Sequence, residues 1–563
     1  MHTVRLDDSP AFETVSYVWG DASVRGALLL QDVTVNVPAS SVAALRRIRL
    51  EDTVRVVWID AVCIDQMSID ERTQQVGLMR FVYGAAFGNL IFLGESETAV
   101  SASHTVTLLY REVLDDTDNL KDLYDTLWHE GGGWKYSSSG FRSNIDVHAL
   151  EMLLSVPWFT RLWVMQEVTA ARLNTCLYGA VKIDLSMLLT VTLWVEHKFM
   201  HIPSSLYRSA GGTIGHEVWE FVDKAQGGRA QGASVGEALR FARSLEATQA
   251  ADKVFGALGL MECISGATSA GIPALLRPDY RKDYPEVYRD AARYALNEND
   301  DSLDEILGLV SHRSQEELED LSRLSWVPRW ERPFDGSRDS TSILERREDF
   351  SACGHARFPG DPGTGADPSV LHLVGREVAT VEEVSPVFDF EIPDGNNIQE
   401  WQAIVCEISK KCRYGEPADL DKILFSVLTA RQRTEDDVAF RSGTAALRQR
   451  WRSLADQEDG VVASTFEEQE PISWALAIGA DQVCDNRRVL RTSDGRLGIG
   501  PRVTKKGDMI TVLLGCAAPY VMRKHDNNQY RLVGDCYLYG VMHGQLTGGT
   551  EQPEYEHRSF AVR

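Results

Sequence analysis

Acidic side chains follow a short apolar run near the beginning of the sequence. Val54–Ile59 is rich in β-branched residues, and Asp60, Asp65 and Gln66 come soon after it. Such a run predicts a strand buried on both faces of a parallel sheet, and ligands of open α/β sheets bind beyond the carboxyl ends of strands. Asp60 and Asp65 could together hold a divalent cation. Aspartates that hydrogen-bond the following loop explain the pattern more simply, so we expect a site without a metal.

A further carboxylate lies on a predicted helix. Pro157 suits the first turn of this helix, and Trp163 and Glu167 are spaced i and i+4, so they share one face. A tryptophan beside a carboxylate can make a partly desolvated acid. The structural alternative is a buried tryptophan with a capping or ion-paired glutamate, because perturbed carboxylates are often structural. Spacing alone leaves both interpretations open.

The elements that must position these groups form an α/β pattern. Apolar runs at the start of the chain, at Val54–Ile59 and at Asn89–Leu93 predict three parallel strands of one sheet, with helices between them. From Asp70 onward the spacing is helical, and the apolar positions include Val76, Met79 and Ala86. We therefore expect an N-terminal domain over residues 1–185 in which helices flank a parallel sheet.

The remainder of the chain predicts two further regions. Residues 186–320 carry long helical patterns, among them Val235–Leu245 and Tyr284–Leu296. Residues 321–563 combine helical segments with short strands at hairpin-like spacing, so we expect an α+β region with a small antiparallel β-barrel joined by a strand from near residue 370. Gly498-Ile-Gly500-Pro501 is followed by no Gly-Lys-Ser/Thr, which predicts a turn rather than a phosphate-binding loop.

Composition limits the partners and the cellular location that can be expected for this protein. The 563 residues carry a formal net charge of −24, which argues against nucleic acid and anionic membrane surfaces as partners. The nine cysteines are scattered without a Cys-x-x-Cys pair, which favours reduced thiols and a cytoplasmic location. No signal peptide and no membrane span are expected, since the apolar runs are well short of about 18 residues.

Four ordered blocks of sequence carry a family resemblance. They resemble the fungal heterokaryon incompatibility (HET) domain and cover about the first third of the chain: Ser16-Tyr-Val-Trp-Gly-Asp21, Trp58-Ile-Asp-Ala-Val-Cys-Ile-Asp-Gln66, Glu71-Arg72-x-x-Gln75-Val76-x-x-Met79 and Arg161-x-Trp163-x-x-Gln166-Glu167. Downstream, Ala251–Leu260 resembles the "RDKVFALLGL" segment common after this domain, with alanine in place of the arginine.

The resemblance implies a fold and an activity. HET domains in turn resemble Toll/interleukin-1-receptor (TIR) domains, which are doubly wound α/β modules, some of which cleave NAD. In the enzymatic TIR domains the catalytic residue is a glutamate four residues after a helical tryptophan, and Trp163-x-x-x-Glu167 matches that pattern. Glu167 is thus the expected catalytic residue. The expected dinucleotide-binding residues are Tyr17, Trp19, Gly20, Asp21, Asp60, Asp65, Gln66, Arg72, Arg161 and Trp163.

The chemistry of the implied reaction fits these residue types. Breaking the nicotinamide–ribose bond passes through an oxocarbenium-like sugar. Nicotinamide leaves as a neutral base, so no general acid is needed, and one carboxylate can stabilise the developing positive charge. No Gly-x-Gly-x-x-Gly follows the first strand, which argues against hydride-transfer use of NAD.

Two functions of different classes follow. The first is an NAD glycohydrolase whose TIR-like HET domain triggers cell death in an incompatibility or immunity-like response. The second is a non-catalytic signalling or adaptor module that self-associates. NAD or a related nucleotide enters as substrate, with no tightly bound cofactor. A second copy of the chain or an incompatibility partner protein is the expected macromolecular partner.

Overall fold

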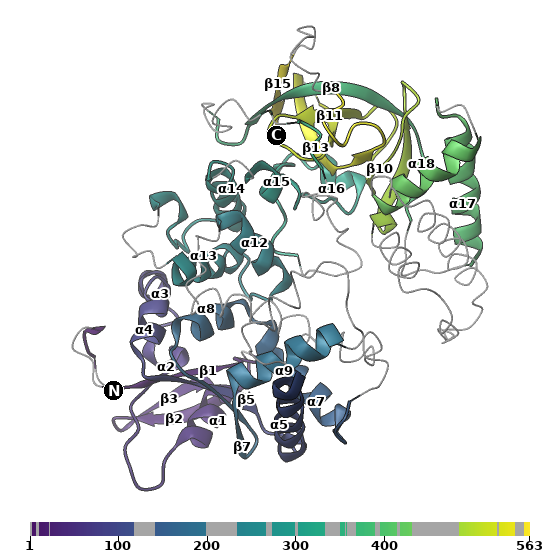
Figure 1. Ribbon diagram of the computed structural model, residues 1–563. Coiled ribbons are helices and arrows are strands. Elements are labelled where there is room, and N and C mark those ends of the chain that lie inside the picture. Colours follow the sequence, from purple (N-terminus) through teal and green to yellow (C-terminus); the bar gives the residue numbers. More distant parts are fainter. Residues whose placement is uncertain are drawn as a thin grey trace. The chain divides into compact units, whose positions relative to one another are not determined.

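The computed structural model describes residues 3–6, 11–21, 23–116, 141–198, 234–265, 273–298, 302–332, 350–354, 356, 367–388, 395–413, 417–430, 483–525, 528–546 and 557–563. The chain divides into two compact units, Met1–Tyr284 and Pro285–Arg563, which are described separately (Figure 1). The domain boundaries expected at residues 185 and 320 remain predictions.

A mixed, mainly parallel sheet forms the centre of the N-terminal unit. Its strands, in spatial order, are β4 (Val57–Trp58), β1 (Glu13–Tyr17), β5 (Gly88–Gly94), β6 (Asn174–Tyr178) and β7 (Val181–Asp184). Strand β1 pairs in parallel with both β4 and β5, which confirms the three predicted parallel strands. Strands β6 and β7 were not expected from the sequence, and β7 runs antiparallel to β6.

The position predicted for Val54–Ile59 is wrong. Only Val57 and Trp58 form strand β4, which lies at the edge of the sheet. Val54 is 92% exposed and Val56 is 41% exposed, so this run is not buried on both faces. The apolar character of a segment does not show whether another strand will pair with each of its two edges. Strand β4 pairs with β1 on one edge and with no described strand on the other.

The strand order places a topological switch point at β1. If the separate hairpin of β2 (Arg25–Leu30) and β3 (Val33–Pro38) is set aside, the strands follow the order 2-1-3-4-5 of a doubly wound sheet. The chain leaves β1 toward β4 on one side and returns to β5 on the other. Such a topological switch point is where ligands of open α/β sheets bind.

Helices cover both faces of this sheet. Helix α1 (Ala39–Ile48) buries Ala44 and Ile48 against side chains of β1 and β5. The long helix expected from Asp70 is instead divided into α3 (Ile69–Val76) and α4 (Met79–Ala85), and the predicted loop before it holds a turn of helix, α2 (Asp60–Cys63). Helix α8 (Leu162–Ala170) packs against α4 and against α13 (Asp252–Ser265).

Close helix contacts hold α8 and its neighbours together. A Cβ atom at Gly259 of α13 would lie 2.3 Å from Gln166 Oε1, so a larger residue there would require the Gln166 side chain to move. The buried Lys253 of α13 donates to the carbonyls of Ala242, Arg243 and Leu245 at the end of α12 (Val235–Ser244). The sequence correctly predicts α12 as a helix.

The C-terminal unit combines helices with a sheet of eight described strands. Its helices are α14 (Tyr284–Ala295), α15 (Ser302–Leu307), α16 (Gln315–Glu319), α17 (Gly395–Lys410) and α18 (Pro417–Thr429). The long strand β8 (Leu371–Val384) pairs with β15 (Arg558–Val562), β11 (Met509–Leu513) and β9 (Arg487–Thr492). The remaining strands are β10 (Leu497–Pro501), β12 (Tyr520–Lys524), β13 (Gln529–Asp535) and β14 (Tyr537–Leu538).

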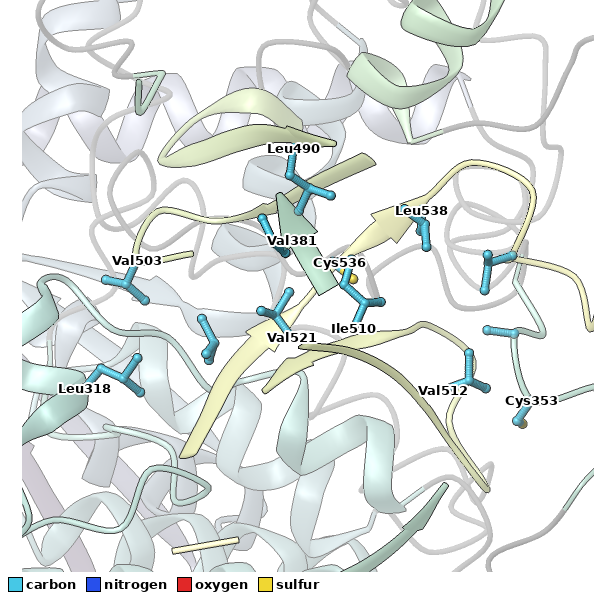
Figure 2. Close-up of a cluster of buried hydrophobic side chains, with 13 residues drawn as sticks. Leu318, Cys353, Val381, Leu490, Val503, Ile510, Val512, Val521, Cys536 and Leu538 are labelled. Atoms are coloured by element: carbon cyan, nitrogen blue, oxygen red, sulfur yellow. The ribbon is translucent and has the colours of Figure 1, made fainter. Parts of the chain in front are cut away.

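Two sequence expectations for this sheet need correction. The Gly498 segment is not a turn but the fully buried strand β10, where a Cβ at Gly498 would meet the Tyr537 carbonyl oxygen at 2.5 Å. The sheet is not purely antiparallel either, because β13 pairs in parallel with β15. Figure 2 shows aliphatic side chains from several of its strands, among them Val381, Ile510 and Val521, packed in one core with Cys353 and Cys536.

Candidate functional site

Asp60 lies just beyond β4 and is held by three hydrogen bonds. Its Oδ1 accepts from the Tyr17 hydroxyl at 3.1 Å and from the Ala61 amide at 2.7 Å, and its Oδ2 accepts from Trp19 Nε1 at 2.7 Å. Packing against protein groups raises the pKa of the Asp60 carboxyl through desolvation, whereas the Arg161 charge and these hydrogen bonds lower it. Both carboxylate oxygens are thus engaged in positioning neighbouring residues.

Glu167 lies on α8 and is 3% exposed. Burial raises the pKa of its carboxyl from 4.5 to about 7, although the Arg161 charge and hydrogen bonds from the Ser16 and Tyr83 hydroxyls lower it. Its Oε2 atom is buried and has no hydrogen-bond partner among the described residues. Because buried polar atoms are nearly always paired, an unpaired carboxylate oxygen calls for an explanation.

Strand β1 separates the two carboxyls and also links them. Successive strand residues point to opposite faces, so Ser16 faces Glu167 while Tyr17 faces Asp60. The Trp158 indole donates to Ser16 Oγ at 2.7 Å, which leaves the Ser16 hydrogen available for Glu167.

Arg161 sits at the carboxyl end of β1, immediately before α8. Its guanidinium donates to the Tyr17 carbonyl oxygen, and its charge lowers the pKa of both Asp60 and Glu167. The Asp60 charge in turn raises the pKa of Glu167. We call this group the Glu167 cluster; it comprises Ser16, Tyr17, Asp60, Tyr83, Arg161 and Glu167.

Trp163 and Arg72 belong to a second group. Trp163 Nε1 donates to Asp252 Oδ2 at 3.3 Å, and the Tyr280 hydroxyl donates to Asp252 Oδ1 at 2.7 Å. The Arg72 guanidinium carbon lies 4.2 Å from the centre of the Tyr280 ring. We call these four residues, Arg72, Trp163, Asp252 and Tyr280, the Asp252 cluster. The indole nitrogen of Trp163 is therefore directed at Asp252.

The other sequence-predicted residues have local roles. Asp65 is exposed and accepts from the Met67 amide at 3.0 Å, as expected for an aspartate that stabilises its own loop. Gln66 donates to the Asp60 carbonyl oxygen at 3.3 Å, and the exposed Asp21 accepts from the Ser23 amide at 2.8 Å. Gly20 adopts a φ of 68°, which favours glycine. Among the described residues there is no group of three or more His, Cys, Asp or Glu suited to a metal ion.

Several residues in these clusters or in contact with them were not predicted as site residues. Ser16 stands inside a recognised block, and Tyr83 fits the apolar face of a helix, so both resemble ordinary structural positions. Trp158 carries no polar pattern that would mark it. Asp252 and Tyr280 lie far along the chain from Trp163 and meet it only through the packing of α13 against α8.

Comparisons with known proteins assign both ends of the chain. Residues 12–167 match the family described as heterokaryon incompatibility protein (HET), and residues 464–556 match the Het-6 beta-barrel domain. The chain is 24% identical over 667 aligned residues to heterokaryon incompatibility protein 6, OR allele, of Neurospora crassa, covering 99% of this chain and 92% of that protein. No solved structure matches the chain.

The HET match spans the Glu167 cluster entirely, since it runs from the residue before β1 to Glu167 itself. In the part of the chain that the structure describes, no helix has the length and apolar character needed to cross a membrane. Two family matches at opposite ends, and a relative aligned over nearly the whole length, agree with the sequence blocks. The chain carries a HET domain and resembles a fungal heterokaryon incompatibility protein along nearly its whole length.

Proposed function

We propose that this protein acts in heterokaryon incompatibility, and that its HET domain cleaves NAD at the nicotinamide–ribose bond to trigger cell death. The first part rests on the similarity to the Neurospora incompatibility protein. The second part rests on the Glu167 cluster. Glu167 is the residue that we assign to stabilise the positive charge on the ribose as nicotinamide leaves.

The unpaired Oε2 atom of Glu167 carries this assignment. Of the two carboxyls beside β1, Asp60 uses both oxygens to hold Tyr17, Trp19 and its own loop. Only Glu167 retains a buried acceptor with no partner among the described residues. A substrate hydroxyl or a developing cation would satisfy it, and in a desolvated site that interaction is stronger than in water.

The raised pKa of Glu167 also suits the reaction. At neutral pH a carboxyl whose pKa is about 7 is about half protonated. Approach of the cationic nicotinamide riboside favours the ionised form, because an opposite charge lowers the pKa of a carboxyl. The carboxylate is therefore most fully formed when the substrate is bound.

The burial of Glu167 favours a second candidate function. A side chain that is 3% exposed reaches a substrate only if neighbouring groups move aside. If they do not move, the protonated carboxyl is a structural group, and the domain is a non-catalytic module that signals by self-association or by binding an incompatibility partner. The two functions make opposite predictions for NAD.

Purified full-length protein incubated with NAD, with free nicotinamide measured over time, tests the proposal. The assay is run at low and high protein concentration, so that a site opened by self-association is also detected. We expect turnover by the wild type, and a loss of about 100- to 1,000-fold in Glu167→Gln, which removes the charge but keeps the size. Glu97→Gln alters an exposed glutamate and should cleave NAD as the wild type does.

Failure of the wild type to release nicotinamide at any concentration would reject catalysis and leave the self-associating module. Normal cleavage by Glu167→Gln would reject the role assigned to Glu167.

A further inference from the structure

Arg72 presents a guanidinium group that stacks on an aromatic ring and has no ion-pair partner among the described residues. The residue is half-buried on α3, and its guanidinium stacks on the ring of Tyr280 at 4.2 Å. Its Nε atom is buried and unpaired, and within the described part of the chain the guanidinium makes no hydrogen bond or ion pair. Stacking holds the planar donor group in place and leaves its N–H groups free for another acceptor.

Asp252 makes no hydrogen bond to Arg72, although the two charges interact. Asp252 lies close enough for its carboxyl to sense the Arg72 charge, but its two oxygens accept from Tyr280 and Trp163 instead. The bond to the Tyr280 hydroxyl positions the ring against which the Arg72 guanidinium stacks. The neighbouring Arg281 offers a contrast, because it is paired with Asp70.

We propose that Arg72 is the phosphate-binding residue of the site, and that it takes the diphosphate of the dinucleotide substrate. A guanidinium presents its donors as a fork that matches two phosphate oxygens, and such charge-assisted pairs are among the strongest hydrogen bonds. The net charge of −24 makes an unpaired local cation all the more necessary for holding an anionic ligand.

The position of Arg72 agrees with this role, which rests on the proposed NAD cleavage. Trp163 of the Asp252 cluster and Glu167 of the Glu167 cluster stand one helical turn apart on α8, a rise of about 6 Å. In a dinucleotide the ribose carbon that bears nicotinamide is separated from the diphosphate by the ribose ring and one methylene, which is a comparable span. Helix α8 thus contributes a residue to each cluster, and the proposal requires one ligand to extend from Glu167 to Arg72.

Calorimetric binding to full-length protein tests the subsite without requiring catalysis. The probes are ADP, inorganic pyrophosphate and adenosine, each titrated into the wild type, Arg72→Gln and Arg281→Gln. We expect ADP and pyrophosphate to bind the wild type and to bind Arg72→Gln about 10- to 100-fold more weakly. Arg281→Gln removes the same charge from an arginine that is already paired, and should change neither affinity by more than about twofold.

Three results would overturn the proposal: no binding of ADP by the wild type at millimolar concentration, equal ADP affinity in Arg72→Gln, or an equal loss for adenosine, which has no phosphate. Arg72-dependent binding of pyrophosphate but not of ADP would overturn the assignment to a nucleotide. If circular dichroism shows that Arg72→Gln does not fold, Arg72→Lys takes its place, and wild-type ADP affinity in that variant rejects the forked contact.

Comparing ADP binding with NAD cleavage in the same proteins separates this proposal from the proposed function. Arg72-dependent ADP binding in a protein that never releases nicotinamide would reject NAD cleavage while supporting the phosphate site. Cleavage that proceeds with an unchanged KM in Arg72→Gln would reject the phosphate site while supporting cleavage.

Discussion

Replacing Glu167 by glutamine should stabilise the protein above neutral pH. Burial raises the pKa of this carboxyl from 4.5 to about 7, so the folded state binds a proton more tightly than the unfolded state does. Below pH 4.5 both states are protonated and the residue has no net effect. Between pH 4.5 and 7 the unfolded state loses this proton while the folded state keeps it, so the free energy of unfolding falls over this range and levels off above pH 7.

The rise in pKa sets the size of the effect. At 1.36 kcal/mol per pKa unit, it corresponds to about 3 kcal/mol of lost stability at pH 8 and above. For a unit of this size, 1 kcal/mol shifts the melting temperature by about 2–4 °C, so Glu167→Gln should melt about 6–12 °C above the wild type at pH 8. Near pH 5 the same linkage gives about 0.8 kcal/mol, so the two proteins should melt within about 3 °C of each other.

Thermal unfolding of the wild type, Glu167→Gln and Glu97→Gln, followed by circular dichroism from pH 5 to pH 8, measures this difference. Glu97 is exposed, so its variant should follow the wild type at every pH. A Glu167→Gln protein that is less stable than the wild type at pH 8 would refute the reasoning. That result would mean that the Arg161 charge outweighs desolvation, and that Glu167 is a structural ion-pair partner.

Three further predictions concern activity and packing. If Glu167 must be ionised, kcat/KM for NAD should rise with pH along a limb with an apparent pKa near 7, and a flat profile between pH 5 and 9 would contradict this. Ser16→Ala removes a hydrogen bond that lowers the Glu167 pKa, so the same limb should move to higher pH; an unchanged limb in a folded variant would show that Ser16 has no such role. Lys253→Met leaves buried carbonyls at the end of α12 without their donor, and should lower the free energy of unfolding in urea by about 3 kcal/mol; a loss below about 0.5 kcal/mol would show that these bonds contribute little.

The sequence predicts local elements well and their neighbours poorly. Strands β1 and β5 and helices α8, α12 and α14 all follow from apolar periodicity, because each buries a face whose spacing is visible in the chain. Periodicity did not reveal that β4 is an edge strand or that β7 runs antiparallel. Both depend on which segments pair across long separations.

The candidate site likewise contains residues that the sequence predicts and residues that only long-range packing reveals. Tyr17, Asp60, Arg161 and Glu167 fall within recognisable blocks, and the structure brings them to the end of β1. Asp252 and Tyr280 could not be assigned, because their roles arise only where α13 packs against α8. The sequence also does not show that Glu167, and not Asp60, keeps an unpaired oxygen. That difference depends on the hydrogen bonds from Tyr17 and Trp19 to Asp60, which form only in the folded structure.

The pairing of β8 has a consequence for how the C-terminal unit reaches its native state. Leu371 pairs with Val562 and Gly375 pairs with Leu513, so this strand finds its partners only after loops of well over a hundred residues close. Closing such loops costs entropy before any contact is gained, which makes folding slow. Until then β8 exposes two unpaired edges, the kind of surface that draws chains into aggregates. We therefore expect refolding of the C-terminal unit to be slow and to lose material to aggregation as the protein concentration rises.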